Sequence, residues 1–149
     1  MSEVLDDSVI LIQTDTTVGF ISKNQDNLKF KKQRPSGKEF LKATSSFKRL
    51  NSFVRVPKKF RRFVRLSDKT TFIYNNSISI RVVKYGKHHS FLKNYGNFFS
   101  SSANLSGHNF QKDISIKLAD IIYKDERGFS ESVPSKIYKL SKIKILKIR

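Results

Sequence analysis

The sequence predicts a single α/β domain in which buried strands alternate with helices. Residues 9–12 form a continuous apolar run rich in β-branched side chains, which is typical of a strand buried on both faces. Further apolar segments alternate with stretches that have polar N-caps and end at glycine or proline, as helices do. With 149 residues, 38% of them hydrophobic, the chain is long enough to bury one core.

The predicted elements follow one another along the whole chain. Strands are expected at residues 9–12, 20–22, 38–43, 70–74, 77–83, 97–101, 120–123 and 143–148. Helices are expected at residues 24–34, 44–50, 57–65, 87–94 and 113–119. Asn24 or Asp26 can cap the first helix, which Pro35 ends because proline disfavours helical backbone in the residue before it. Thr44 or Ser45 can cap the second helix.

The charge of the chain is strongly positive and unevenly distributed. Thirty Lys and Arg against 12 Asp and Glu give a formal net charge of +18, which favours binding to polyanions such as nucleotides or RNA. Residues 29–69 carry 15 basic and two acidic side chains, and residues 136–149 carry six basic and no acidic ones. Because the chain is also rich in Asn, Ile, Phe and Ser, AT-rich coding is an alternative explanation for the bulk charge.

The most basic helix is expected after Pro57. Phe60 and Phe63 lie three residues apart, as on one face of a helix, and the surrounding residues 58–65 are mostly Lys and Arg. This pattern predicts a surface helix, with contact to RNA as a secondary possibility.

Composition excludes several kinds of site. Without cysteine there is no disulfide framework, thiolate chemistry or cysteine-based metal site. His88 and His89 are neighbours that cannot share one helical face, and His108 stands alone, so we expect no metal site. No apolar run approaches the roughly 20 residues of a membrane span, and the acidic N-terminus does not resemble a signal peptide. We therefore expect a cytoplasmic protein.

A polar turn follows the strand expected at residues 97–101. Residues 100–107, Ser-Ser-Ser-Ala-Asn-Leu-Ser-Gly, bring hydroxyls, an amide and a glycine to the point where the strand stops. Such groups suit a pocket for an oxyanion or a nucleotide. The alternative is an ordinary turn, since Ser, Asn and Gly are common turn residues.

The order of these residues resembles the Ser-Thr-Ser-Ala-Asn-Leu-Ser-Gly segment of the threonylcarbamoyl-AMP synthase (YrdC-like) family. Two earlier segments are similar to motifs of the same family. Residues 13–19 resemble its Pro-Thr-Glu-Thr-x-Tyr-Gly loop, although Gln13 replaces the proline and Val18 the aromatic residue. Residues 32–35, followed by Lys38, resemble its Lys-x-Arg-Pro-x-x-Lys motif, whose spacing lets two cations face one phosphate.

The resemblance extends through the second half of the chain. Arg81 matches the arginine of the family's Val-Arg-Val strand, and Thr71 matches a threonine that follows a Pro-Gly-Pro loop, which this chain lacks. Pro134 and Ser135 resemble the family's Pro-Ser-Thr-Val element. Arg149 corresponds to the arginine of its Ile-x-Arg element.

The resemblance implies a fold and an activity. The fold would be one domain over residues 1–149, a twisted, mostly parallel sheet that curves around a basic cavity and is flanked by helices. Family members join L-threonine, bicarbonate and ATP to give threonylcarbamoyl-AMP and pyrophosphate. Downstream tRNA-modification proteins use this product to form threonylcarbamoyladenosine. Mg²⁺ would arrive with ATP, because Asp15 is the only carboxylate near these motifs in the sequence.

The resemblance also assigns roles to individual residues. The expected catalytic residues are Lys32, Arg34, Ser102 and Asn104. The expected threonine-binding residues are Thr14, Thr16 and Arg81. The expected ATP-binding residues are Lys38, Thr71, Ser135 and Arg149. The main alternative is a non-catalytic YrdC-like protein that binds double-stranded or structured RNA, such as tRNA. A third possibility is a ribosome-associated basic protein without a pocket.

Overall fold

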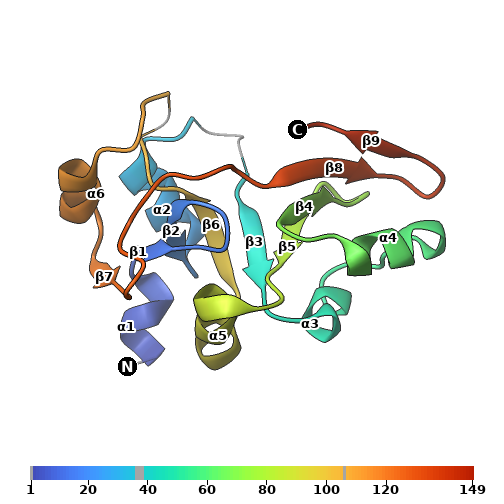
Figure 1. Ribbon diagram of the computed structural model, residues 1–149, viewed down its shortest axis with the longest axis horizontal. Coiled ribbons are helices and arrows are strands. Elements are labelled where there is room, and N and C mark those ends of the chain that lie inside the picture. The colour runs from blue at the N-terminus through green and yellow to red at the C-terminus, as the bar shows by residue number, and fades with distance from the viewer. Residues whose placement is uncertain (1, 36–38, 106) are drawn as a thin grey trace. The chain divides into compact units, whose positions relative to one another are not determined.

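The contacts within the chain divide it into two compact units, which are described separately. The computed structural model describes residues 2–35, 39–105 and 107–149. The first unit comprises Met1–Phe40 and Phe98–Val133, and the second comprises Leu41–Asn97 and Pro134–Arg149. Each unit is therefore built from two separate stretches of the chain (Figure 1). That one domain covers residues 1–149 stays a prediction.

The first unit contains four strands in the order β7-β1-β2-β6. They are β1 (Ile10–Gln13), β2 (Val18–Ser22), β6 (Phe98–Ser102) and β7 (Ile121–Tyr123). Strand β1 pairs with β7 in parallel, whereas β2 pairs antiparallel with both β1 and β6. Every residue of β1 and β2 is buried, as the continuous apolar run predicts.

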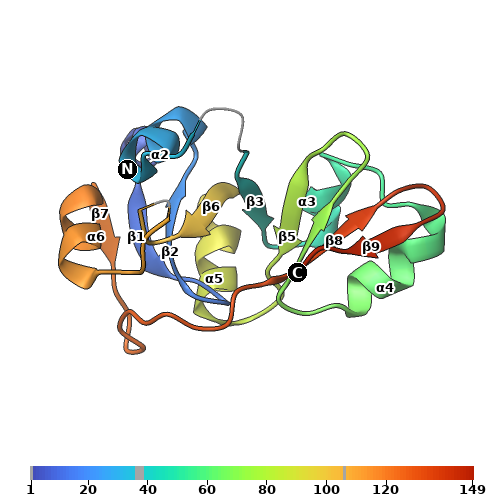
Figure 2. The same cartoon turned by 90° about the horizontal axis from the view of Figure 1, so that it is seen from above.

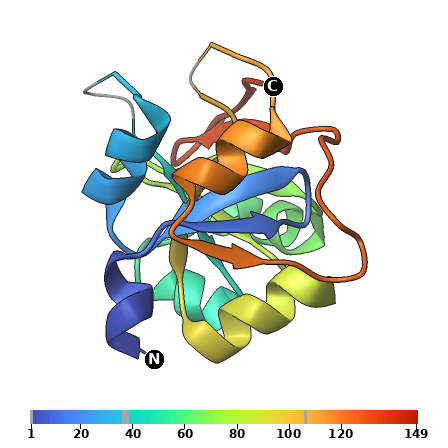
Figure 3. The same ribbon diagram turned by 90° about the vertical axis from the view of Figure 1, so that its left-hand side faces the viewer.

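Two helices cover the core of the first unit. They are α2 (Gln25–Lys32) and α6 (Lys112–Leu118), and Figure 3 shows α6 lying over the strands. Leu28 of α2 is fully buried against Leu11 and Phe20, and Ile116 of α6 packs on the same cluster. Asn24 caps α2 by accepting hydrogen bonds from two backbone N–H groups. A further helix, α1 (Ser2–Asp7), was not expected from the sequence.

The second unit contains five strands in the order β3-β5-β4-β8-β9. They are β3 (Leu41–Thr44), β4 (Thr70–Ile73), β5 (Ser79–Val82), β8 (Lys136–Leu140) and β9 (Ile145–Lys147). Pairs β3–β5 and β4–β8 are parallel, and pairs β4–β5 and β8–β9 are antiparallel. Figure 2 shows β8 and β9 as a hairpin beside β4.

The helices of the second unit are short. They are α3 (Phe47–Asn51), the 3-10 turn η1 (Lys58–Phe60), α4 (Arg61–Leu66) and α5 (Gly86–Tyr95). Ser46, rather than Thr44 or Ser45, caps α3, because β3 extends through Thr44. A core of Leu50, Phe72 and Ile80 lies between these helices and the strands.

The α/β class and the helices flanking a sheet are thus confirmed, with mixed rather than uniform pairing in both units. Strand β8, which the sequence analysis did not assign, inserts beside β4. Across the described ranges, no helix has the length and apolar character needed to cross a membrane.

Truncation of Leu28 tests the packing of α2. The side chain is completely buried, so Leu28→Ala should lower the free energy of unfolding by about 2–5 kcal/mol. Phe30→Ala in the same helix is the matched control, because Phe30 is 80% exposed and its loss should cost less than about 0.5 kcal/mol. Urea denaturation of the two variants measures the difference, and equal stabilities would contradict this packing.

Candidate functional site

The pairing of β2 with β6 places two polar segments side by side. Gly19 lies opposite Ser102 and Phe20 opposite Ser101, and the Ala103 N–H donates to the Val18 carbonyl at 3.0 Å. The loop that precedes β2 and the turn that follows β6 therefore meet at the same edge of the first unit. Both segments carry part of the family resemblance.

Gly19 is required by this close approach. A Cβ atom at position 19 would lie 2.8 Å from the Ser101 carbonyl oxygen and 3.0 Å from Cγ2 of Thr14. Both distances are shorter than ordinary van der Waals contacts, and the first partner is backbone that cannot rotate away. The glycine thus lets the threonine loop and strand β6 come together.

Thr14 organises the loop between β1 and β2. Its hydroxyl donates to the Thr17 carbonyl at 2.5 Å and accepts from the Thr16 and Thr17 N–H groups, each at 3.2 Å. The Thr14 and Thr16 hydroxyls lie 3.3 Å apart, and both side chains are buried.

Lys32 reaches β6 from the last turn of α2. Its Nζ donates to the Ser101 hydroxyl and to the Ser102 carbonyl, both at 2.7 Å. Only 3% of the residue is exposed. Burial, and then the nearby Arg34 guanidinium, lowers the pKa of Lys32 to about 8. The ammonium is therefore mostly charged at neutral pH and desolvated.

Arg34 follows the left-handed residue Gln33 that ends α2. Its guanidinium lies over the Phe40 ring at 4.4 Å, and Nη2 donates to the Glu39 carbonyl at 3.0 Å. Burial lowers the pKa of Arg34, and the Glu39 carboxylate opposes this shift. Nε is buried and has no hydrogen-bond partner among the residues that the structure describes. An anionic ligand is one way to satisfy that donor.

Asn104 holds the turn after β6. Its side-chain amide donates to the Leu105 carbonyl at 3.1 Å and to the His108 carbonyl at 2.6 Å, and its oxygen accepts from the Ser102 hydroxyl. Asn104 thus fixes the shape of the turn and orients Ser102, which is exposed. The turn and pocket interpretations of this segment are compatible, because the turn is what presents the hydroxyl.

Direct contacts and strand pairing bring together most of the site residues predicted in the first unit. Lys32 contacts Ser102 through its carbonyl, Ser102 contacts Asn104, and strand pairing sets the loop of Thr14 and Thr16 beside them. Lys38, predicted to bind ATP, and Ser106 of the polar turn lie outside the described residues.

The remaining predicted residues form a cluster in the second unit. The Thr71 and Ser135 hydroxyls are 2.9 Å apart, and Arg149 donates through Nε to the Ser135 carbonyl at 2.9 Å. Arg81 lies opposite Thr71 in the pairing of β4 with β5. Burial, and then Arg81, lowers the pKa of Arg149, so the two guanidinium groups are close enough to repel each other.

Hydrogen bonds from a distant segment, which the sequence analysis did not predict, hold the threonine loop. The Gln13 side chain accepts from the Ser130 N–H at 2.9 Å. The Arg127 guanidinium donates to the Gln13 carbonyl at 2.8 Å and to the Thr14 carbonyl at 3.4 Å, while Asp125 binds it through two oxygens. Gln13 stands where the similar family motif has a proline, and these bonds restrain the backbone at this position. No sequence motif connects residues so distant.

Two further features bear on a binding site: groups of metal-ligating side chains, and a cavity. No three His, Asp or Glu side chains gather to share an ion within the described ranges. A cavity of about 680 Å³ lies in the second unit, lined by Leu50, Val56, Arg61 and neighbouring residues. None of the residues with a predicted catalytic or binding role lines it.

The burial of Lys32 has a consequence for the pH dependence of stability. Its pKa is about 8 in the folded chain and 10.5 when solvated, so between these values the unfolded chain binds more protons. The free energy of unfolding should therefore rise from pH 8 to pH 10.5, by about 3 kcal/mol.

Lys32→Met should fold and should lack this rise, whereas Lys117→Met, which changes an exposed lysine of α6, should keep it. Urea denaturation at a series of pH values measures both. A flat profile in the unsubstituted protein would contradict the desolvated ammonium.

Arg127→Gln should loosen the threonine loop without unfolding the unit. In the unsubstituted protein, the Arg127 guanidinium holds the Thr14 carbonyl, and the Thr14 hydroxyl accepts from the Thr16 and Thr17 N–H groups. Loss of Arg127 therefore exposes these two amides indirectly, by freeing Thr14. Their hydrogen exchange should accelerate on the order of tenfold, while exchange within β6 stays unchanged. Lys124→Gln is the control, an exposed charge on the same segment. Unchanged exchange in Arg127→Gln would show that Gln13 alone restrains the loop.

Comparison with known proteins relates the whole chain to a group of solved structures. A double-substituted P. abyssi Sua5 superposes with a TM-score of 0.82 at 12% identity, over 99% of this chain and 54% of that chain. P. abyssi Sua5 complexed with L-threonine gives 0.81 at 13%, over 99% and 52%. E. coli YciO gives 0.79 at 18%, over 99% and 85%.

The sequence comparisons give no match: neither a family profile nor a curated protein matches the chain. The chain spans about half the length of P. abyssi Sua5 and 23% of T. kodakarensis HypF, which it matches with a TM-score of 0.79. At identities of 12 to 18%, these likenesses establish a common architecture. The chain therefore has the YrdC-like fold shared by Sua5, YciO and HypF, as its motifs predicted.

Proposed function

We propose that the chain is an L-threonylcarbamoyladenylate synthase, which joins L-threonine, bicarbonate and ATP and releases pyrophosphate. The observation that carries this proposal is the contact of the buried Lys32 ammonium with Ser101 and Ser102, at the edge where the threonine loop ends. Three segments far apart in the sequence supply these groups. The L-threonine bound by P. abyssi Sua5, which has the same fold, supports threonine as a substrate.

The reaction needs charge neutralisation more than a covalent nucleophile. The protonated amine of threonine and bicarbonate first form a carbamate, with release of water and a proton. A carbamate oxygen then attacks the α-phosphorus of ATP, and pyrophosphate leaves. Because the carbamate and ATP are both anionic, the main barrier is to bring them together and to stabilise the charge that develops on the leaving pyrophosphate.

Lys32 is suited to this task. An ammonium has three N–H donors, and two of those of Lys32 are directed at Ser101 and Ser102. The third has no partner among the described residues and can bind a carbamate or phosphate oxygen. Burial strengthens this interaction, because the charge is poorly screened by water. Arg34, whose buried Nε is unsatisfied within the described chain, would supply a second cationic donor.

Other residues would position the substrates. Thr16 would bind threonine beside the restrained Thr14, and Ser102 would face the α-phosphate or carbamoyl group. In the second unit, Thr71, Arg81, Ser135 and Arg149 would bind threonine or ATP, and Lys38 would contact ATP as well. Mg²⁺ would be held mainly by the ATP phosphates, which would supply most of its ligands. The product would pass to tRNA-modification proteins, and we expect this to take place in the cytoplasm.

Pyrophosphate release, measured with each substrate withheld in turn, tests the activity. Arg34→Ala should lower the rate by roughly 10²–10³, since it removes a cationic donor worth about 2–4 kcal/mol in the transition state. Lys112→Ala, at an exposed position of α6, is the control and should keep the full rate. Circular dichroism confirms that both variants fold.

Turnover of Arg34→Ala close to that of the unsubstituted protein would remove this residue from the mechanism. Absence of pyrophosphate from the unsubstituted protein, with all three substrates present, would remove the synthase itself and favour the non-catalytic RNA-binding alternative.

A further inference from the structure

The cavity of the second unit combines an apolar floor with a charged rim. Its volume of about 680 Å³ lies in the range of sites that hold small organic ligands. The floor consists of aliphatic core side chains that are less than a tenth exposed: Leu50, Val54, Val56 and Val64. Phe47 and Phe53, which are partly buried, line the cavity as well. Such a surface favours the hydrocarbon part of a ligand, because contact removes apolar area from water.

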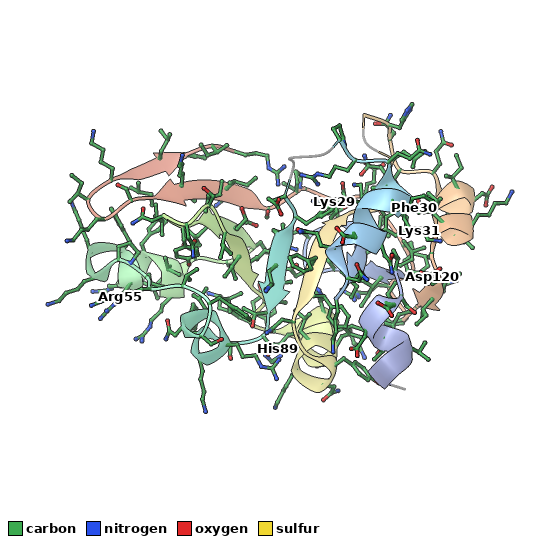
Figure 4. The ribbon with its side chains drawn as sticks, turned by 180° about the vertical axis from the view of Figure 1, so that it is seen from behind. Lys29, Phe30, Lys31, Arg55, His89 and Asp120 are labelled. Carbon is green, nitrogen blue, oxygen red and sulfur yellow. The ribbon has the colours of Figure 1, made fainter. Side chains whose placement is uncertain are left out.

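Three exposed arginines form the rim of the cavity. Arg55 lies between α3 and η1 in the chain, and Figure 4 shows it beside the helices of this unit. Its two chain neighbours, Val54 and Val56, are buried in the floor, so the arginine alternates with them and stays at the surface. Arg61 and Arg65 are four residues apart in α4 and therefore project from one side of that helix.

The charge of the rim is not compensated within the part of the chain that the structure describes. None of the three arginines forms an ion pair with a described carboxylate. The Arg61 Nε donates to the Val56 carbonyl at 3.5 Å, whereas the side chains of Arg55 and Arg65 form no hydrogen bond with described residues. Their donors are therefore available to an anion.

An amide adds to the donors at the opening. Asn76 lines the cavity, and its side-chain oxygen already accepts from the Ile78 N–H at 3.2 Å. The group that it can offer to a ligand is therefore its NH₂. Guanidinium and amide donors without a nearby acid suit a head group that carries several acceptor oxygens.

The cavity and the residues predicted to bind ATP lie on opposite faces of the same strands. Phe72 of β4 and Ile80 of β5 belong to the core cluster that also supplies the floor of the cavity. Successive residues of a strand point to opposite faces, so Thr71 and Arg81 point away from the cavity. Thr71 contacts Ser135 on that other face. The cavity is therefore a separate site.

We propose that this cavity binds an organic phosphate monoester with a short hydrocarbon body. The phosphate lies between the rim arginines, and the hydrocarbon lies on the aliphatic floor. Three cations favour phosphate over carboxylate, because a phosphate monoester carries a charge of about −1.5 to −2 at neutral pH. The proposal does not depend on the proposed function, since none of the residues that would carry that reaction lines the cavity.

Other kinds of ligand match only one part of the cavity. Inorganic phosphate would leave the apolar floor uncovered, and an uncharged hydrocarbon would leave the arginines unpaired. A sugar phosphate would place hydroxyl groups against Val54 and Val64, which offer no hydrogen bonds from their side chains. A polyanion has phosphates but no hydrocarbon that could reach the floor. The combination of rim and floor therefore favours an amphipathic anion.

Isothermal titration calorimetry with hexyl phosphate, butyl phosphate, inorganic phosphate, hexanoate and 1-hexanol tests the ligand class. Each methylene placed on the floor should tighten binding about fourfold, so hexyl phosphate should bind on the order of tenfold more tightly than butyl phosphate. The other three probes should all bind more weakly than hexyl phosphate. Binding of inorganic phosphate or 1-hexanol as tight as that of hexyl phosphate would overturn the proposal, as would tighter binding of hexanoate.

Amide NMR spectra recorded during the same titration locate the bound phosphate. The largest shifts should fall within residues 50–56 and 61–65, which line or flank the cavity. Largest shifts at Ser135 and Arg149 would place hexyl phosphate in the predicted ATP cluster and would overturn the proposal. Pyrophosphate release by the protein is a separate measurement, and its absence would remove the synthase while leaving this result unchanged.

Arg55→Gln/Arg65→Gln tests the rim. Both positions are exposed, so the variant should fold, and it should bind hexyl phosphate about tenfold or more weakly. The matched control is Lys58→Gln/Arg62→Gln, which removes the same charge from exposed positions of η1 and α4 that do not line the cavity. This control should bind nearly as the unsubstituted protein does. Equal losses in the two variants would show that only the overall charge attracts the phosphate.

Asn51→Trp tests the floor without a change in charge. Asn51 is the exposed last residue of α3 and lines the cavity, so an indole there should occupy the space for the hydrocarbon and abolish binding of hexyl phosphate. Asn94→Trp, at an exposed position of α5 away from the cavity, is the control and should bind normally. Circular dichroism confirms that both variants fold. Unchanged binding by Asn51→Trp would overturn the proposal.

Discussion

The register of β2 against β6 is the constraint on which the first unit depends. A shift by one residue would place another residue where Gly19 lies, and a Cβ there would be 2.8 Å from the Ser101 carbonyl oxygen, so this pairing favours one alignment. In that alignment Gly19 lies against the Ser101 carbonyl, and the threonine loop and the polar turn meet. Lys32 then reaches the backbone of the same strand, so a helix, a loop and a turn depend on one pairing.

Each unit holds a cation whose pKa is lowered by burial and by a second cation, although Lys32 is buried and Arg149 is exposed at the surface. In the first, burial and Arg34 lower the pKa of Lys32, and in the second, burial and Arg81 lower that of Arg149. A chain selected for stability alone would avoid desolvating one cation beside another. An anion bound near either pair would relieve both the desolvation and the repulsion, which is the electrostatic condition that a nucleotide or a carbamate provides.

Local chemistry explains which features could be predicted. The apolar run of β1 and the cap at Asn24 are short-range signals, and each was found where expected. Tertiary contacts decide what was missed: β8 becomes a strand because β4 offers it an edge, and Phe63, although 41% exposed, packs edge to face on Tyr138. The restraint of Gln13 by a segment more than one hundred residues away has no local signal at all.

That distant restraint affects how the molecule matures. Arg127 follows Thr14 by 113 positions, so this tether closes one of the longest loops in the chain. Long-range contacts form late, since chain entropy must be overcome before they contribute. During synthesis the threonine loop would be made early, and it would stay without this tether until the chain had been made as far as Arg127. The threonine loop would thus reach its restrained shape only after most of the chain had been made.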